Sequence, residues 1–197
     1  MIGIIDYGLG NIKAFENIYK SLGDQITRIN KKEKFKHCSH LILPGVGSFD
    51  QAIKLLKKSN LLEELNNQVI QKKKPILAVC VGMQIMANSS SEGTSKGLGW
   101  IPGKVISFKE EYQFNFEVPH MGWNDLNLIK NKDPLFKDIE NPSFYFLHSY
   151  RFKPDFLDHI VSYSTYGIEF VSTIRSKNIW ATQFHPEKSH YSGIKLL

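Results

Sequence analysis

The sequence is poor in cysteine and contains no long hydrophobic run. Its two cysteines, Cys38 and Cys80, are too few for a disulfide-stapled domain, although a single disulfide is formally possible. No apolar stretch approaches the roughly 20 residues that span a bilayer, and the first residues lack the basic flank and apolar core of a signal peptide. Internal repeats, low-complexity tracts and linkers are also absent. We therefore expect a cytoplasmic protein without a membrane segment, folded as one domain over residues 1–197.

Charge is only moderately unbalanced, which limits the kinds of partner. Lys and Arg number 25 against 19 Asp and Glu, so the net charge is +6. The lysines fall in scattered short clusters, without the interleaved aromatic or glycine-rich patterns of RNA-binding segments. We interpret these clusters as solvated faces and expect no nucleic-acid partner. A phosphorylated partner or ligand is the remaining alternative.

The first half of the chain alternates strand and helix patterns. Short apolar runs that end in turn residues predict strands at residues 2–5, 25–29, 40–43 and 75–79. Amphipathic spacing predicts one helix capped by Asn11 and ended by Gly23, and a second helix from about Asp50. The run at 75–79 is apolar throughout, as in a central parallel strand. This alternation predicts an α/β fold with a mostly parallel sheet flanked by helices.

The second half has a different character. Strand patterns recur at residues 104–108, 144–147, 160–163, 168–174 and 180–184, and helical pattern is scarce until Gly193. We expect these strands to form an antiparallel extension of the sheet.

Two motifs in the first half are weak signals for a cofactor. The run Gly8-Leu9-Gly10 follows a strand but has Lys13 where a dinucleotide fingerprint needs its third glycine. His37, Cys38 and His40 lie close together, but no second pair sits at zinc spacing. We expect neither a metal nor a cofactor.

Cys80 lies where a nucleophile would be expected. It follows an apolar strand directly and precedes helix-forming residues, with the small residues Ala78 and Gly82 two positions to either side. This pattern matches a nucleophile elbow, in which strand and helix nearly touch. A thiol placed there, beside a helix N-terminus, is favoured in its thiolate form. An inert core cysteine is the alternative.

A thiolate nucleophile needs a base, and the base needs an orienting acceptor. His185 ends a predicted strand and can reach the same sheet edge as Cys80, and Glu187 lies two positions further on. A surface turn is the alternative for this His-Pro-Glu segment. The backbone N–H of Val81 and the glycine-rich loop at Val46 and Gly47 are candidate donors to an oxyanion.

Several segments resemble the class I (triad) glutamine amidotransferases. Ala-Val-Cys-Val-Gly-Met-Gln around Cys80 resembles the family's nucleophile segment, Gln-Phe-His-Pro-Glu-Lys-Ser resembles its His-x-Glu segment, and Pro-Gly-Val-Gly-Ser-Phe resembles its oxyanion loop. The segments at 97–103, 118–124 and 146–150 are similar to the glutaminase subunits of imidazole glycerol phosphate synthases. The match spans nearly the whole chain in family order. It departs from the family at Val81, usually leucine, and at Ala78, frequently glycine.

The resemblance implies a flavodoxin-like, class I glutaminase fold and the hydrolysis of L-glutamine to glutamate and ammonia. It implies catalytic roles for Cys80, His185 and Glu187, and an oxyanion site at Val46, Gly47 and Val81. The residues that it implies for substrate binding are Gln84, Glu92, His148, Ser149 and Tyr150.

The resemblance also implies a partner, a (β/α)₈-barrel cyclase that forms a heterodimer with this chain and receives its ammonia for histidine biosynthesis. The interface positions that it implies are Asn11, Met121, Trp123 and Lys188. Three alternatives remain open. They are a glutaminase that feeds a sugar-modifying synthetase, a non-catalytic relative that retains a buried thiol, and a cysteine hydrolase of other acyl substrates.

Overall fold

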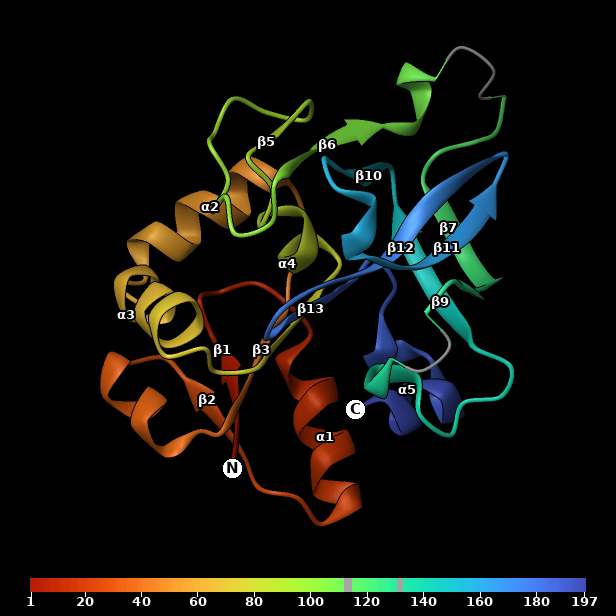
Figure 1. Cartoon of the computed structure of the whole chain (residues 1–197). Coiled ribbons are helices and arrows are strands. Elements are labelled where there is room, and N and C mark those ends of the chain that lie inside the picture. The colour runs from red at the N-terminus through yellow and green to blue at the C-terminus, as the bar shows by residue number, and fades with distance from the viewer. Residues whose placement is uncertain (112–114, 131–132) are drawn as a thin grey trace.

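The computed structural model describes residues 1–111, 115–130 and 133–197. Within them, the main sheet has eight strands in the order β2-β1-β3-β4-β13-β12-β11-β8 (Figure 1). Its parallel part comprises β1 (Ile2–Ile5), β2 (Ile26–Ile29), β3 (His40–Leu43), β4 (Ile76–Val79) and β13 (Ile179–Thr182). Its antiparallel part comprises β8 (Asn127–Leu128), β11 (Ile160–Tyr166) and β12 (Ile168–Ser176). The predicted α/β fold, a mostly parallel sheet with an antiparallel extension, is confirmed.

Strand pairing departs from the expectation in two places. The strand predicted at 180–184 pairs in parallel with β4 on one side and antiparallel with β12 on the other, so it joins the two parts of the sheet. The strands predicted at 104–108 and 144–147 lie outside the main sheet. They belong to a three-stranded sheet of β5 (Ser89–Ser90), β6 (Gly103–Ser107) and β10 (Tyr150–Pro154), and to a pair of β7 (His120–Asp125) and β9 (Ser143–His148). Local pattern predicts a strand but does not determine its neighbours.

The order of the parallel strands puts helices on both faces of the sheet. The chain steps from β1 to β2 in one direction and from β3 to β4 in the other. Because such crossovers are right-handed, the connecting helices must lie on opposite faces. The α-helices are α1 (Ile12–Leu22), α2 (Phe49–Lys58), α3 (Leu62–Asn66), α4 (Val81–Gln84) and α5 (His190–Leu196). The shorter helical turns are η1 (Lys32–His37), η2 (Asn67–Gln71, a π-helix), η3 (Phe108–Glu110), η4 (Pro134–Phe136), η5 (Leu157–His159) and η6 (Pro186–Lys188).

The ends of α1 and α2 test the expected capping residues. Gly23 adopts the left-handed conformation, φ 79°, and its N–H reaches the carbonyls of the last turn of α1, as predicted. Asn11 makes no side-chain capping hydrogen bond, so that part of the prediction was wrong. Helix α2 begins one residue before the predicted Asp50, because Ser48 caps it by accepting from the backbone N–H of Gln51.

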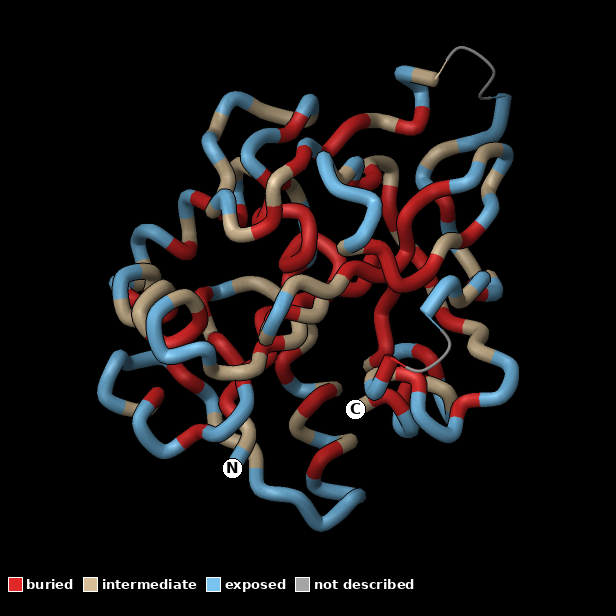
Figure 2. Tube along the Cα trace, in the orientation of Figure 1, coloured by how far each residue is buried: buried red, intermediate tan, exposed pale blue. Residues whose placement is uncertain are grey.

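The buried hydrophobic residues form two clusters, and Figure 2 shows in red where buried residues lie along the chain. The larger cluster is mostly aliphatic and lies around the parallel strands, with Ile4, Leu43 and Leu56 almost fully buried. The smaller one is aromatic and includes Phe146 and Phe170 beneath the antiparallel part. Stacked and edge-on rings fill this smaller core, which supports β9 next to the candidate site.

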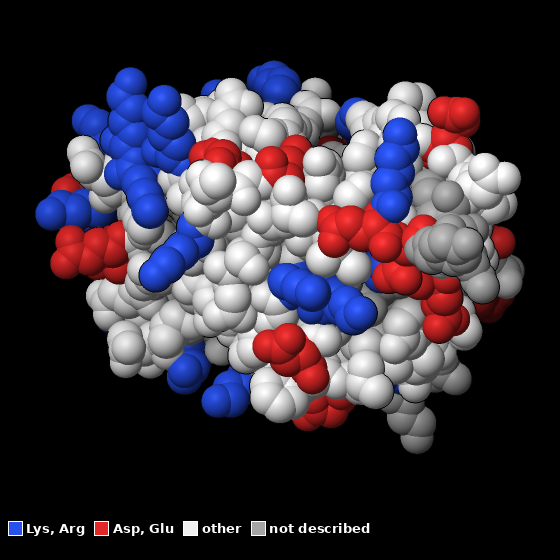
Figure 3. All heavy atoms as spheres, turned by 90° about the horizontal axis from the view of Figure 1, so that it is seen from above, with Lys and Arg blue, Asp and Glu red and all other residues white. Residues whose placement is uncertain are grey.

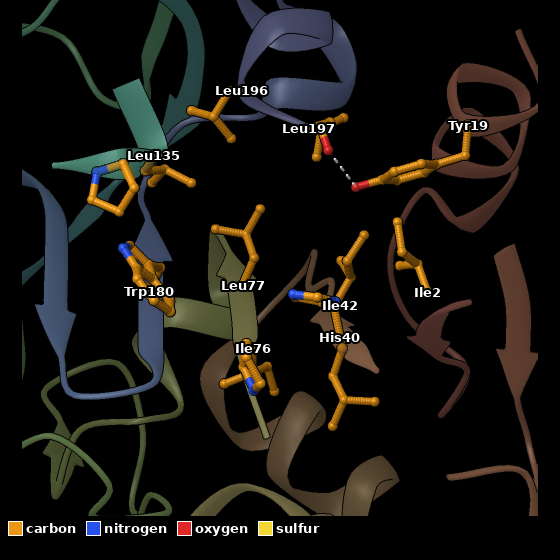
Figure 4. A pocket seen from close by; sticks show the side chains of 13 residues that line it. Ile2, Tyr19, His40, Ile42, Ile76, Leu77, Leu135, Trp180, Leu196 and Leu197 are labelled. Carbon is orange, nitrogen blue, oxygen red and sulfur yellow. Dashed lines mark hydrogen bonds between the residues drawn. The ribbon is translucent and has the colours of Figure 1, made fainter. Parts of the chain in front are cut away.

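An apolar cavity of about 500 Å³ lies against the face of the sheet that carries α1 and α5 (Figure 4). Aliphatic and aromatic side chains such as Ile42, Leu77 and Trp180 form most of its wall, and the Tyr19 hydroxyl donates to the Leu197 carbonyl at 3.0 Å beside it. None of the predicted site residues lines this cavity. The candidate chemistry therefore lies elsewhere.

Two features bear on possible partners. Among the described residues, no helix has both the length and the hydrophobicity needed to cross a bilayer. Seen from above, Lys and Arg occupy several separate groups, with Asp and Glu between them and no continuous basic tract on that face (Figure 3).

Candidate active site

Cys80 occupies a strained turn between β4 and α4. Its backbone has φ 55° and ψ −113°, a conformation that a residue with a side chain rarely adopts, and its N–H donates to the Thr182 carbonyl at 2.8 Å. Its side chain is nearly buried. Strain of this kind is typical of a nucleophile elbow, in which the turn presents the nucleophile at the carboxyl end of a strand.

Glycines allow the loop after β3 to lie against this elbow. A Cβ on Gly82 would lie 2.2 Å from the Leu43 carbonyl oxygen, and a Cβ on Gly45 would lie 2.3 Å from the Gly82 nitrogen. The Tyr7 hydroxyl donates to the Pro44 carbonyl at 2.8 Å, which ties the loop to the end of β1. The loop that contains Val46 and Gly47 thus borders the same cavity as Cys80.

His185 and Glu187 follow β13 and form a buried pair. The His185 backbone N–H donates to the Tyr145 carbonyl at 2.8 Å, which holds the segment against β9. Glu187 Oε1 lies 2.8 Å from His185 Nδ1, and both side chains are at most 3% exposed. Because a carboxylate accepts, Nδ1 carries the proton, and Nε2 is left for another partner.

The electrostatics of His185 depend on Cys80 and Glu187. Burial by itself lowers the pKa of His185, but the Coulombic and hydrogen-bonding contacts with Cys80 and Glu187 outweigh burial and raise the pKa to about 10. At neutral pH the imidazole ring is therefore protonated beside the sulfur.

A cavity of about 270 Å³ collects most of the predicted site residues. Its lining residues are Val46, Gly47, Cys80, Val81, Gln84, Glu92, Pro119, Leu147, His148, Ser149, Tyr150, His185 and Lys188. Glu187 is not among them and contacts His185 from outside the cavity wall. Sequence reasoning did not single out Pro119 and Leu147, since neither carries a chemical signal. The small volume and polar wall suit a small polar molecule.

Glu92 and Gln84 are held in place on the wall of this cavity. Glu92 Oε2 accepts from the backbone N–H of Phe49, the first residue of α2, at 2.8 Å. Gln84 Nε2 donates to the Tyr150 carbonyl and to Gln183 Oε1, each at 3.1 Å. Gln84 lines the cavity, and its Oε1 accepts no hydrogen bond from the part of the chain that the structure describes.

His148 belongs to a chain of ring contacts that the sequence did not reveal. Its Nδ1 donates to the Tyr150 carbonyl at 2.8 Å, so its Nε2 must accept from His120 Nδ1 at 3.1 Å. His120 Nε2 in turn accepts from Asn124, 3.3 Å away. Burial lowers the pKa of His148 to about 3 and that of His120 to about 4, so both rings are neutral near pH 7.

Three of the four predicted interface residues lie close together. Lys188 lines the cavity, and Met121 and Trp123 lie beside it on β7. Met121 and Trp123 lie two positions apart on β7, so they share one face of the strand, and they are 62% and 50% exposed. The Trp123 ring is 6.4 Å from the Tyr145 ring, and Lys188 Nζ lies 5.8 Å from the same Tyr145 ring. Asn11, the residue before α1, takes no part in these ring contacts among the described residues.

Comparison with known proteins assigns the chain to a family. The model of the family described as glutamine amidotransferase class-I matches residues 4–195. The chain belongs to the class I glutamine amidotransferase family.

Curated relatives narrow the resemblance within the family. The amidotransferase is 45% identical to "Imidazole glycerol phosphate synthase subunit HisH" of Leptospira borgpetersenii, over all of this chain and 97% of the relative. It is 43% identical to the protein of the same name from Methanocaldococcus jannaschii, over all of this chain and 96% of that relative. The predicted family is confirmed, and these relatives do not favour the sugar-modifying alternative.

Solved structures agree on the fold. A crystal structure of a glutamine amidotransferase superposes with a TM-score of 0.76 at 19% identity, covering 99% of this chain and 94% of that one. The structure of PurLQS from Thermotoga maritima gives 0.74 at 16% identity, again covering 99% of this chain and 94% of the other.

Proposed function

We propose that this chain is a glutaminase subunit that hydrolyses L-glutamine to glutamate and ammonia. The observation that carries the proposal is the junction of Cys80 with His185 and Glu187 at one end of the sheet, in a chain 45% identical to an imidazole glycerol phosphate synthase subunit. By resemblance to that subunit, the ammonia passes to a (β/α)₈-barrel cyclase, which forms imidazole glycerol phosphate and an aminoimidazole carboxamide ribotide.

The chemistry follows from the charge state of the pair. The Cys80 thiolate attacks the side-chain amide carbon of glutamine. His185, protonated at neutral pH because its pKa is raised, supplies a proton to the departing nitrogen. The C–N bond breaks, ammonia leaves and a thioester remains on Cys80. Neutral His185 then takes a proton from water, whose oxygen attacks the thioester. Glutamate leaves, and the proton returns the pair to its starting state.

Glu187 would act by orientation. Its carboxylate accepts from Nδ1 of His185 at 2.8 Å, which directs Nε2 toward the reacting groups and stabilises the ring while it is charged. Backbone N–H groups of Val81 and of the Val46–Gly47 stretch would stabilise the oxyanion of each tetrahedral intermediate.

The polar wall of the cavity would hold the two ends of the substrate amino acid. The Glu92 carboxylate suits an α-ammonium group, and Gln84 Oε1 is an acceptor on the same wall. Ser149, Tyr150 and His148 complete the wall that faces them. His148, whose pKa is lowered to about 3, would contribute as a neutral ring rather than as a charge.

The partner would dock on the face that carries Met121 and Trp123, next to Lys188 at the rim of the cavity. Asn11 is the fourth position proposed there, by resemblance alone. Ammonia released into water is protonated and no longer nucleophilic, so direct contact between the two subunits has a physical purpose.

The test pairs a single substitution with two nitrogen sources. Cys80→Ala in the reconstituted complex should abolish glutamine-dependent turnover, because no thioester can form. It should leave turnover with added ammonium salt, because that route bypasses the cavity. Both rates are measured by product formation. Glutamine-dependent turnover near the wild-type rate would contradict the proposal.

A further inference from the structure

Gln183 is a fully buried polar residue next to the sulfur. It follows the last residue of β13 and lies two positions before His185. Its backbone N–H donates to the Ser172 carbonyl at 2.9 Å, which fixes the main chain there. Its Nε2 lies 3.7 Å from Cys80 Sγ, within hydrogen-bonding distance for sulfur.

One backbone carbonyl determines how the amide of Gln183 is turned. The Tyr150 carbonyl can only accept, so the Gln84 group 3.1 Å from it must be the NH₂. The same NH₂ group faces Gln183 at 3.1 Å, and the atom it meets must therefore be the oxygen of Gln183. The opposite end of that amide, its NH₂, is left facing Cys80 Sγ.

The other groups around Cys80 Sγ show why a donor such as the Gln183 NH₂ group is needed there. The Leu147 carbonyl oxygen lies 3.8 Å from Cys80 Sγ, where it can accept from a thiol but cannot donate to a thiolate. Once the proton is lost, that carbonyl opposes the negative sulfur, and donors must outweigh it. Gln183 Nε2 and His185 are donors that the structure places at the sulfur. His185 ceases to be a donor to the sulfur when it gives up the proton on that side of its ring. The amide of Gln183 does not titrate, so its N–H remains a donor throughout.

We propose that Gln183 is a positioning residue of the proposed glutaminase, with two effects. Its NH₂ group stabilises the thiolate of Cys80, and its oxygen holds Gln84 so that Gln84 Oε1 faces the substrate. The inference rests on the proposed function, since it assigns Gln183 to that same site. Gln183 does not line the cavity, so it acts through Cys80 and Gln84 and not on the substrate.

The test measures how the reactivity of the Cys80 sulfur depends on pH, in the absence of glutamine. The intact chain is treated with iodoacetamide at a series of pH values, and the rate of Cys80 alkylation is followed by mass spectrometry of its peptide. Gln183→Glu keeps an oxygen for Gln84 but places a carboxylate beside the sulfur. We expect the pH midpoint of alkylation to rise by about one unit or more, as for a like charge in contact. Gln183→Met removes the donor without adding charge and should give a smaller rise.

Gln68→Met is the matched control, because Gln68 is also buried but bonds to Glu64, away from the site. Its alkylation profile should equal that of the wild type, and thermal melts identify any variant that fails to fold. If Gln183→Glu does not fold, the comparison of Gln183→Met with Gln68→Met decides. In glutamine hydrolysis, Gln183→Met should raise KM as well as lower kcat, because Gln84 keeps its hydrogen bond to the Tyr150 carbonyl but loses the one to Gln183.

The outcomes distinguish failure of the role proposed for Gln183 from failure of the proposed glutaminase function. Unchanged alkylation profiles in folded Gln183 variants would overturn the role of Gln183 and leave the proposed glutaminase standing. Wild-type Cys80 that alkylates no faster than Cys38 would instead overturn the proposed function, and the inference with it.

Discussion

At the scale of single residues, the candidate site combines groups whose properties depend on each other. Burial alone would leave His185 uncharged, yet contacts with Cys80 and Glu187 raise its pKa to about 10. The same burial lowers the pKa of His148, which has no anionic neighbour among its contacts. Two imidazole rings that line one cavity therefore differ in charge, and this difference favours His185 for the proton transfers that we propose.

Glu187→Gln tests the proposed orienting role. The amide cannot stabilise a charged ring as the carboxylate does, and its NH₂ favours the wrong tautomer of His185. We expect kcat for glutamine hydrolysis to fall about 100-fold or more, the range of general acid–base catalysis, measured on protein that thermal melts show to be folded. Glu63→Gln, at an exposed position, serves as the control for losing one negative charge. Equal kcat in the two variants would remove Glu187 from the mechanism.

At the scale of elements, close approach of backbones at the elbow is the decisive feature. Gly82→Ala would set a methyl group against the Leu43 carbonyl, which is backbone and cannot move aside. The free energy of unfolding should fall by about 1–3 kcal/mol, as for overpacked sites, and activity should be lost. Gly23→Ala meets open space, and its left-handed φ of 79°, which Gly82 does not share, should cost about 1 kcal/mol with activity retained. Urea unfolding and a hydrolysis assay compare the two variants, and full activity in Gly82→Ala would be the contrary result.

How far the elements could be predicted depended on the range of their interactions. β1 and the end of α1 at Gly23 followed from neighbouring residues, and Cys80 followed from a local strand-turn-helix pattern. The neighbours of β13 did not follow, because parallel pairing with β4 joins segments about 100 residues apart. His120 and Gln183 stand in segments that resemble the family, but nothing in the sequence assigned either of them a role. Each contacts a residue far away in the sequence, His148 for His120 and Cys80 for Gln183.

At the scale of the whole molecule, His120 and His148 connect stability to pH. Both have folded pKa values, about 4 and about 3, below the ordinary value of 6.5. Between pH 6.5 and about 4 the unfolded chain binds protons that the folded chain does not, so acid favours unfolding. Stability should fall as pH drops through this window, by up to about 1.4 kcal/mol per pH unit for each ring. His120→Gln should reduce that slope in urea unfolding at several pH values, and an unchanged slope would contradict the assignment.

The most direct test of the central claim is to label the sulfur with a glutamine analogue that carries an electrophilic diazoketone in place of the side-chain amide. The chain contains its own control, because burial raises the pKa of the Cys38 thiol, which lies far from the candidate cavity. Peptide mass spectrometry should find one adduct, on Cys80, that excess glutamine prevents and that His185→Gln slows. An adduct on Cys38, or labelling of Cys80 that glutamine does not prevent, would contradict the account.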